Sequence, residues 1–195
     1  SALFTPAVVR YVWRSDSLCH RVLVKKLSVG GCVINKNMDE SAYKEILDGL
    51  RRQNVRAVVF DFDCTISIKH SGGRVRKEKF PTFVENNISP TFKFILRRFL
   101  DDGISVGVAS FADNYKASDA YIAGEPMIRM YFRHHFGEDF SGRVPIVAAY
   151  PENYQTADAY RTVGLSSPMP RDKSFHLARL AEGWRLPPAS LALVD

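Results

Sequence analysis

Acidic and hydroxyl side chains stand directly behind several short apolar runs of this sequence. Asp61 follows the run 57–60, Ser110 follows 104–109 and Asp195 follows 191–194, while Asp63 comes two residues after Asp61. A carboxylate can serve as a nucleophile, as a general acid or base, or as a ligand of a hard cation such as Mg²⁺. If the fold brings these side chains together, they form a candidate active site.

From about Met38 onward, the apolar runs alternate with segments of helical spacing. Capping residues mark where three helices begin, at Asp39 or Ser41, at the Ser89-Pro90 pair and at Asp172, and Gly103 marks where one helix ends. The sequence predicts strands at 56–61, 104–109, 144–149 and 191–194, and helices at 39–53, 89–103, 126–137 and 172–182. We expect loops at 66–88 and 152–171, which are polar or irregular.

Repeated strand–helix units predict an α/β fold of Rossmann-like type, a three-layer α/β/α sandwich with a mostly parallel sheet. Parallel strands need crossover connections, and these place helices on both faces of the sheet. The continuous apolar character of the runs fits strands that are buried on both sides. Ligands of such sheets bind beyond the carboxyl ends of the strands, and the four polar residues named above fall there.

The segment Asp61-Phe62-Asp63-Cys64-Thr65 resembles the first signature, Asp-x-Asp-x-Thr, of the haloacid dehalogenase (HAD) superfamily. The other signatures follow in the family's order, with Ser110 at a strand end, Lys173 at a helix start and Asp195 at the end of the last strand. The similarity covers roughly residues 55–195. It implies a HAD-like catalytic domain over residues 38–195. The family's usual second acid, strand and helix do not follow Asp195, so we expect a domain truncated at its C-terminal end.

The resemblance implies a magnesium-dependent phosphatase that works through an aspartyl-phosphate. Asp61 would be the nucleophile and Asp63 the general acid and base, while Thr65, Ser110 and Lys173 would bind the substrate phosphate. Asp61, Asp63 and Asp195 would hold Mg²⁺, Asp63 through its backbone carbonyl. A phosphomonoester is negatively charged, and an anionic nucleophile can attack it only when that charge is neutralised. This requirement explains why acidic metal ligands and a lysine accompany the nucleophile.

The residues after the first signature suggest a small flap without a large cap. Only about 24 residues separate Thr65 from the helix at Ser89, and they include five cations (Lys69, Arg74, Arg76, Lys77 and Lys79). His70 and Arg74 are candidate substrate contacts. An open site of this kind fits a phosphorylated small molecule or a phosphorylated macromolecule, and a basic flap can attract an acidic substrate.

The net charge of +6 is concentrated in residues 1–37, which carry six basic residues and one acid. This segment is either a structured extension or a transit-like leader to an organelle. The rest is nearly neutral, which argues against general nucleic-acid binding, except of a nucleic-acid end as substrate. The sequence has no run of about 18 apolar residues, so we expect no membrane-spanning helix. Its three scattered cysteines favour a reducing, cytoplasmic compartment. The sequence does not predict an oligomeric state.

Two other functions remain open at this point. A phosphotransferase or mutase of the same superfamily would share these residues. A catalytically weakened HAD-like domain would use them only to bind. A carbon–halogen hydrolase would lack the second acid, so Asp63 argues against it.

Overall fold

The computed structural model of the protein describes residues 9–11 and 38–195, and for 9–11 it describes only the backbone of a strand. The short apolar runs at 22–34, which suggest a hairpin, lie outside the described residues. So does most of the basic segment 1–37. Among the described helices, none is both long enough and apolar enough to cross a bilayer.

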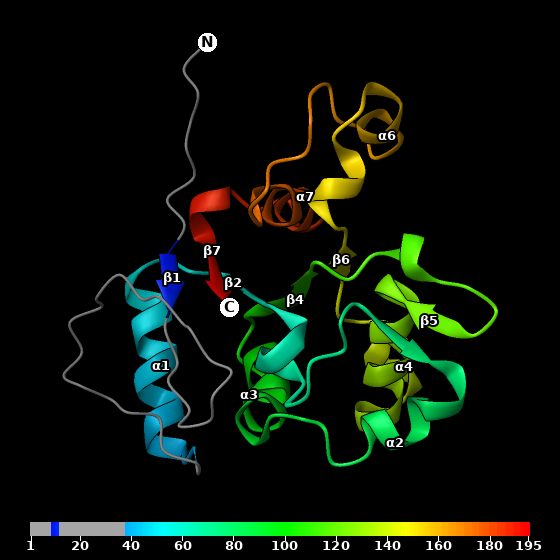
Figure 1. Ribbon diagram of the computed structural model, residues 1–195. Coiled ribbons are helices and arrows are strands. Elements are labelled where there is room, and N and C mark those ends of the chain that lie inside the picture. The colour runs from blue at the N-terminus through cyan, green and yellow to red at the C-terminus, as the bar shows by residue number, and fades with distance from the viewer. Residues whose placement is uncertain (1–8, 12–37) are drawn as a thin grey trace.

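Five parallel strands form one sheet in the order β1-β7-β2-β4-β6 (Figure 1). They are β1 (Val9–Tyr11), β2 (Ala57–Phe60), β4 (Ser105–Ser110), β6 (Ile146–Ala148) and β7 (Leu191–Val194). Every side chain of the central strand β2 is buried. Its register pairs Phe60 with Val108 of β4 and with Val194 of β7. The next residue of each strand, Asp61, Ala109 and Asp195, therefore comes to the same edge of the sheet.

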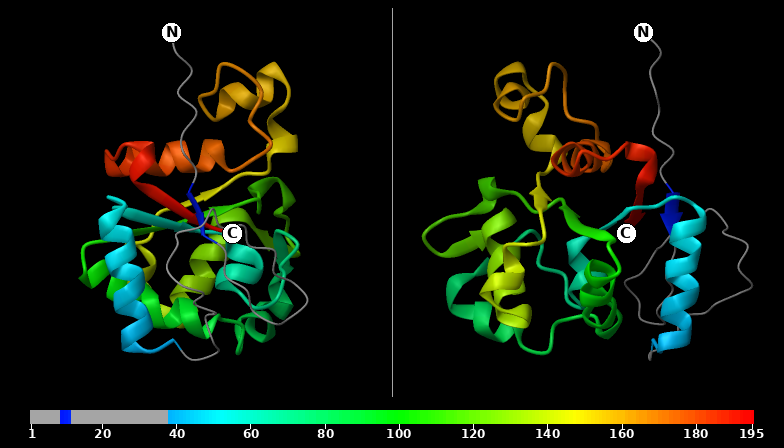
Figure 2. Two further views of the ribbon diagram at one scale, coloured as in Figure 1. Left: turned by 90° about the vertical axis from the view of Figure 1, so that its left-hand side faces the viewer. Right: turned by 180° about the vertical axis from the view of Figure 1, so that it is seen from behind.

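Helices cover both faces of this sheet, which confirms the predicted α/β fold (Figures 1 and 2). The even-numbered residues of β2 pack on one face with α1 (Glu40–Arg52), α3 (Pro90–Asp101) and α4 (Gly124–Phe136). The odd-numbered residues pack on the other face with α7 (Ser174–Trp184). This alternation follows from the period of two along a strand.

The helix starts use the capping residues that the sequence predicts. Asp39 accepts a hydrogen bond from the backbone N–H of Ala42 (2.8 Å), and Ser89 accepts one from Phe92 (3.3 Å). Both caps satisfy a backbone donor that the first turn leaves without a partner. The predicted helices and strands of the large sheet are confirmed within a few residues at their ends.

Two segments expected as loops contain regular structure, so those predictions were wrong. Residues 66–88 contain β3 (Arg74–Arg76) and α2 (Phe80–Val84), and β3 pairs antiparallel with β5 (Tyr121–Ala123). Residues 151–162 contain a 3₁₀ turn, Pro151–Tyr154, and α6 (Ala157–Thr162). The helix α5 (Glu138–Ser141) extends the end of α4. The small β3–β5 sheet packs on the core beside α4. We keep the name flap for the segment 66–88, which contains β3.

Candidate functional site

The ammonium group of Lys173 lies where three neighbouring strands end. Its Nζ donates to Oδ1 of Asp61, which follows β2, and to the carbonyl of Ala109 in β4 (2.6 Å). It also lies 3.8 Å from Oδ1 of Asp195, which follows β7. The Lys173 side chain is only 6% exposed. A buried charge requires such partners, and this arrangement therefore fixes the position of the ammonium.

Asp61 is held at the sheet edge by its backbone as well as by its side chain. Its N–H donates to the carbonyl of Val194 (2.8 Å), which continues the β2–β7 ladder by one residue. Burial raises the pKa of Asp61, and the Lys173 ammonium opposes that rise by favouring the ionised carboxylate. Asp195 adds to the rise, because a second negative charge nearby disfavours ionisation. The ionised form of Asp61 thus depends on Lys173.

Asp63 faces the flap instead. Its two carboxylate oxygens accept hydrogen bonds from the N–H (2.7 Å) and the hydroxyl (3.0 Å) of Ser71. The next residue, Cys64, adopts a left-handed conformation (φ 61°), which is uncommon for a residue other than glycine. The second acid of the motif is therefore tied to a different element from the first.

His70 lies beside Asp63 without a hydrogen bond to it. Its Nδ1 is 3.5 Å from the Asp63 carboxylate, but the same Nδ1 accepts a hydrogen bond from the N–H of Gly72 (2.8 Å). An imidazole nitrogen that accepts carries no proton. His70 therefore shapes the flap turn and presents its Nε2 elsewhere.

The other predicted residues are spread around this edge. Ser110 is buried, and its hydroxyl accepts a hydrogen bond from the N–H of Ala112 (3.1 Å). Thr65 is half-buried in the turn after Asp61. Arg74 lies exposed on β3, with its guanidinium 4.4 Å from the centre of the Tyr121 ring. The structure thus brings Asp61, Lys173 and Asp195 into contact, and places Arg74 on the flap.

Two buried residues that sequence reasoning did not assign also hold this edge. His176 is fully buried, and its Nε2 lies 3.1 Å from the carbonyl of Ser110 and 3.0 Å from that of Ala149. Its Nε2 bridges the ends of β4 and β6 as a donor, and burial favours the neutral ring by lowering its pKa to about 4. Its place in the helix opened by Lys173 was the available signal.

Asp113 is the second such residue, at 1% exposure. Its carboxylate accepts from the N–H of Tyr115 (3.0 Å) and from the N–H of Tyr150 (2.8 Å). It also bonds the hydroxyl of Tyr154, whose pKa is raised to about 12 by burial and by this carboxylate. Asp113 therefore joins the loop after β4 to the loop after β6. An acid three residues after Ser110 was the only sequence signal.

The acids at the sheet edge can be compared with what Mg²⁺ requires. Among the described residues, no group of three or more His, Cys, Asp or Glu side chains is placed to hold a metal ion. The Asp63 carboxylate, which is bound by Ser71, leaves Asp61 and Asp195 as the acids that share the Lys173 ammonium. Mg²⁺ is often bound by one or two carboxylates and keeps several waters. The pair of carboxylates Asp61 and Asp195 agrees in number with the protein ligands of such a partly hydrated ion.

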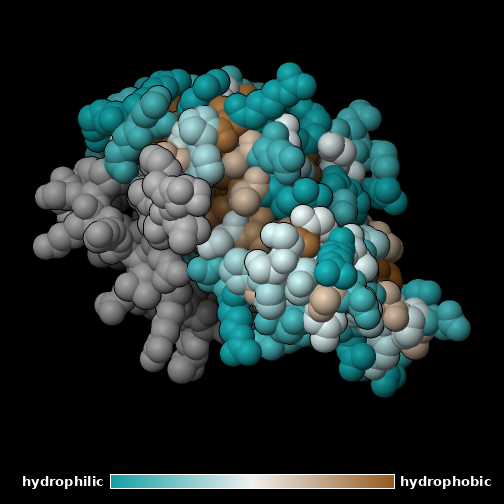
Figure 3. All heavy atoms as spheres, turned by 90° about the horizontal axis from the view of Figure 1, so that it is seen from above, coloured by the Kyte–Doolittle hydropathy of each residue, from teal (hydrophilic) through white to brown (hydrophobic). Residues whose placement is uncertain are grey.

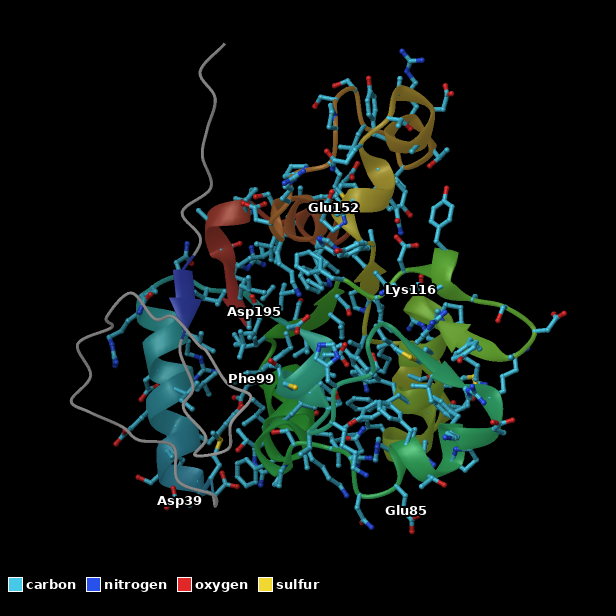
Figure 4. The ribbon with its side chains drawn as sticks, in the orientation of Figure 1. Asp39, Glu85, Phe99, Lys116, Glu152 and Asp195 are labelled. Atoms are coloured by element: carbon cyan, nitrogen blue, oxygen red, sulfur yellow. The ribbon has the colours of Figure 1, made fainter. Side chains whose placement is uncertain are left out.

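A pocket of about 130 Å³ opens beside Lys173. It is lined by Phe111, Arg171, Asp172, Lys173, Ser174, Leu177, Leu193 and Asp195. Figure 4 shows Asp195 at the tip of β7 and Lys116 farther along, on the loop that leads to β5. Seen from the α7 side, the described surface is mostly hydrophilic, and hydrophobic colours occupy smaller areas within it (Figure 3). Lys173 and Asp195 line the pocket, whereas Asp61, Asp63 and Ser110 do not.

Comparison of the sequence with protein-family models, curated proteins and solved structures gives no match.

Proposed function

We propose that this chain is a magnesium-dependent phosphomonoester hydrolase of HAD type. The observation that carries the proposal is the position of Lys173, whose ammonium contacts Asp61 and Ala109 and lies near Asp195. These residues come from four separate segments of the chain and meet at the carboxyl edge of a parallel sheet. A cation and two carboxylates at this edge suit a dianionic phosphate ester together with a divalent metal.

Asp61 is the nucleophile in this proposal. Lys173 holds its Oδ1, and the other carboxylate oxygen attacks phosphorus while the bond to the leaving oxygen breaks. Asp61, Asp195 and the Asp63 carbonyl would hold Mg²⁺, which would supply the charge neutralisation that an anionic attack on an anion requires. The product of this step is an aspartyl-phosphate and a free alcohol.

Asp63 moves the proton in both half-reactions. It donates to the leaving oxygen in the first, and in the second it takes a proton from the water that attacks the phosphoryl group and regenerates Asp61. Ser71 orients its carboxylate through two hydrogen bonds. Ser110, Thr65 and Lys173 are assigned to the phosphate oxygens. His70 and Arg74 stay candidates for contacts with the remainder of the substrate.

The test is hydrolysis of p-nitrophenyl phosphate with magnesium, with EDTA and with calcium. We expect turnover with magnesium, loss with EDTA and recovery when magnesium returns. Calcium should support binding without turnover, because its looser coordination disturbs the line of attack. Full activity in calcium alone would contradict the mechanism. Binding of inorganic phosphate with no turnover in any metal would instead favour the weakened binding module.

A further inference from the structure

A continuous series of contacts connects Lys173 to the flap. Its Nζ lies 4.6 Å from the centre of the Phe111 ring, and Phe111 meets Tyr150 edge to face at 6.5 Å. The Nζ of Lys116 lies 5.4 Å from the centre of the Tyr150 ring and donates to the carbonyl of Gly72 in the flap turn (3.1 Å). Two neighbouring aromatic rings, Phe111 and Tyr150, therefore lie between the cations Lys173 and Lys116. We call Phe111, Tyr115, Lys116 and Tyr150, with Arg74 and Arg76, the aromatic–cation rim.

The tyrosines of this rim are exposed to solvent. Only four large hydrophobic side chains are exposed in the described part of the chain, and Tyr115 (67%) and Tyr150 (37%) are two of them. A third, Ile68 (49%), lies in the flap, and the fourth, Met130, lies on α4. Grouped exposed apolar side chains mark an interaction site, whereas single ones need no explanation. Two of the four exposed large side chains lie on the rim and a third lies in the adjoining flap, which favours this region of the described surface as an interaction site.

The cations of the rim are held in place by aromatic rings. Arg74 stacks on Tyr121, and Nε of Arg76 donates to the Tyr121 hydroxyl (3.1 Å). Lys69, Lys77 and Lys79 add positive charge to the same flap. The exposed acids in the flap segment 66–88 and in the segment 111–123 are Glu78, which contacts Arg76, Glu85 and Asp119. The basic character is therefore local to the flap, although residues 38–195 as a whole are nearly neutral.

We infer that the aromatic–cation rim binds a single-stranded oligonucleotide whose terminal phosphate is the substrate. The inference rests on the proposed function for the chemistry. The base next to the terminal phosphate stacks on the exposed tyrosines, and the following phosphates meet Lys116, Arg74 and Arg76. Exposed aromatic rings beside cations are the usual surface for single strands, because every base has a flat face and every nucleotide a charge. A phosphopeptide has no such repeat and leaves the exposed rings without a role.

Binding is measured first, without any need for turnover. Fluorescence anisotropy of a labelled oligothymidylate without a terminal phosphate reports docking on the full chain even if the protein is not a hydrolase. We expect the double variant Tyr115→Ala, Tyr150→Ala to bind about tenfold more weakly, the size of effect that stacking of one base provides. Tyr115→Phe with Tyr150→Phe keeps the rings and should keep the affinity. Met130→Ala, an exposed apolar control on α4, should change nothing.

The charges are tested by salt dependence. Arg74→Gln with Arg76→Gln should lower both the affinity and the slope of log affinity against log salt. Arg52→Gln is the matched control, because Arg52 is exposed at the end of α1. This end of α1 leads into the start of β2, and the candidate site lies where β2 ends. Absence of oligonucleotide binding at low salt, or full affinity in the Tyr115→Ala, Tyr150→Ala protein, would overturn the inference.

Turnover then identifies the substrate. We expect 5′- or 3′-phosphorylated oligothymidylate to give a higher kcat/KM than glycerol phosphate, and the tyrosine double variant to lose this preference while glycerol phosphate hydrolysis stays unchanged. A phosphoserine peptide of equal charge that is preferred to both oligonucleotides would overturn the inference in favour of phosphoproteins. In either case p-nitrophenyl phosphate turnover tests the hydrolase proposal separately.

Discussion

The sheet edge around Lys173 and the aromatic–cation rim differ in how their charges are held. At the sheet edge, Lys173 and Asp61 are 6% and 17% exposed and are fixed by strands, a helix terminus and buried hydrogen bonds. On the rim, Arg76 and Glu78 are 54% and 70% exposed and pair only at the surface. A buried pair is costly to break, whereas an exposed pair contributes little. The molecule therefore separates a buried ion pair, the proposed reaction centre, from a solvent-exposed surface, the proposed substrate-binding rim.

The largest expected effect of any substitution is at the nucleophile. Asp61→Asn keeps the shape of the side chain, but an amide oxygen is a poor nucleophile and a poor metal ligand. We expect kcat for p-nitrophenyl phosphate to fall at least about a thousandfold, with the far-ultraviolet circular dichroism unchanged. A folded Asp61→Asn protein that keeps more than a tenth of the wild-type rate would exclude this residue as nucleophile.

The next largest effect should come from Lys173→Met, which keeps the length of the side chain and removes its charge. Without the ammonium, Asp61 is left buried beside Asp195, and the phosphate loses a cation. We expect kcat to fall about a hundredfold and the free energy of unfolding to fall by about 3 kcal/mol, measured by denaturant titration. Lys44→Met, an exposed residue of α1, is the matched control. Equal effects at both lysines would contradict the comparison between buried and exposed charge.

The sequence was sufficient to predict the strands and helix starts of the large sheet, because the signals for these elements are local. β2 and β7 are continuous apolar runs, and each ends in an acid whose place follows from the parallel register. The caps Asp39 and Ser89 likewise act within one helical turn. Physical features that lie close together in sequence, such as a buried run and its terminal residue, are enough to predict where such a side chain goes.

The flap could not be predicted in the same way. β3 and β5 have three residues each, too few for a clear alternation, and more than 40 residues separate them. Their pairing depends on Val75 and Ile122 packing against the core beside α4, which no local pattern reports. The bond between Asp63 and Ser71 and the bridge made by Asp113 are contacts of the same kind. α6 is missed because six residues give little helical periodicity.

A moderate effect is expected where the two regions meet. Ser71→Ala removes the hydroxyl bond to Asp63 (3.0 Å) and leaves the N–H bond (2.7 Å). Because an intramolecular hydrogen bond contributes about 1 kcal/mol, we expect kcat to fall about fivefold, with KM little changed. Ser118→Ala, exposed before β5, is the control. A change in KM alone would mean that Ser71 serves binding and not the orientation of the acid.

The smallest effect is expected at His176, and it concerns stability instead of rate. The pKa of His176 is lowered to about 4 in the folded protein because its ring is buried, whereas an unfolded histidine titrates near 6.5. Between these values the unfolded chain binds more protons than the folded one, so stability is present above about pH 6.5 and is lost as the pH falls toward 4. Linkage gives a loss of about 1 kcal/mol between pH 7 and pH 5.5.

His176→Gln can still donate toward the carbonyls of Ser110 and Ala149 but does not titrate. We therefore expect its free energy of unfolding to fall less than that of the wild type over this pH interval, whatever its value at neutral pH. His135 is partly buried and its pKa is also lowered to about 4, so His135→Gln measures a comparable contribution away from the sheet edge. If the His176→Gln and wild-type curves run parallel between pH 7 and pH 5.5, the ring is not held neutral by burial. The bridge between β4 and β6 would then not depend on His176 staying uncharged.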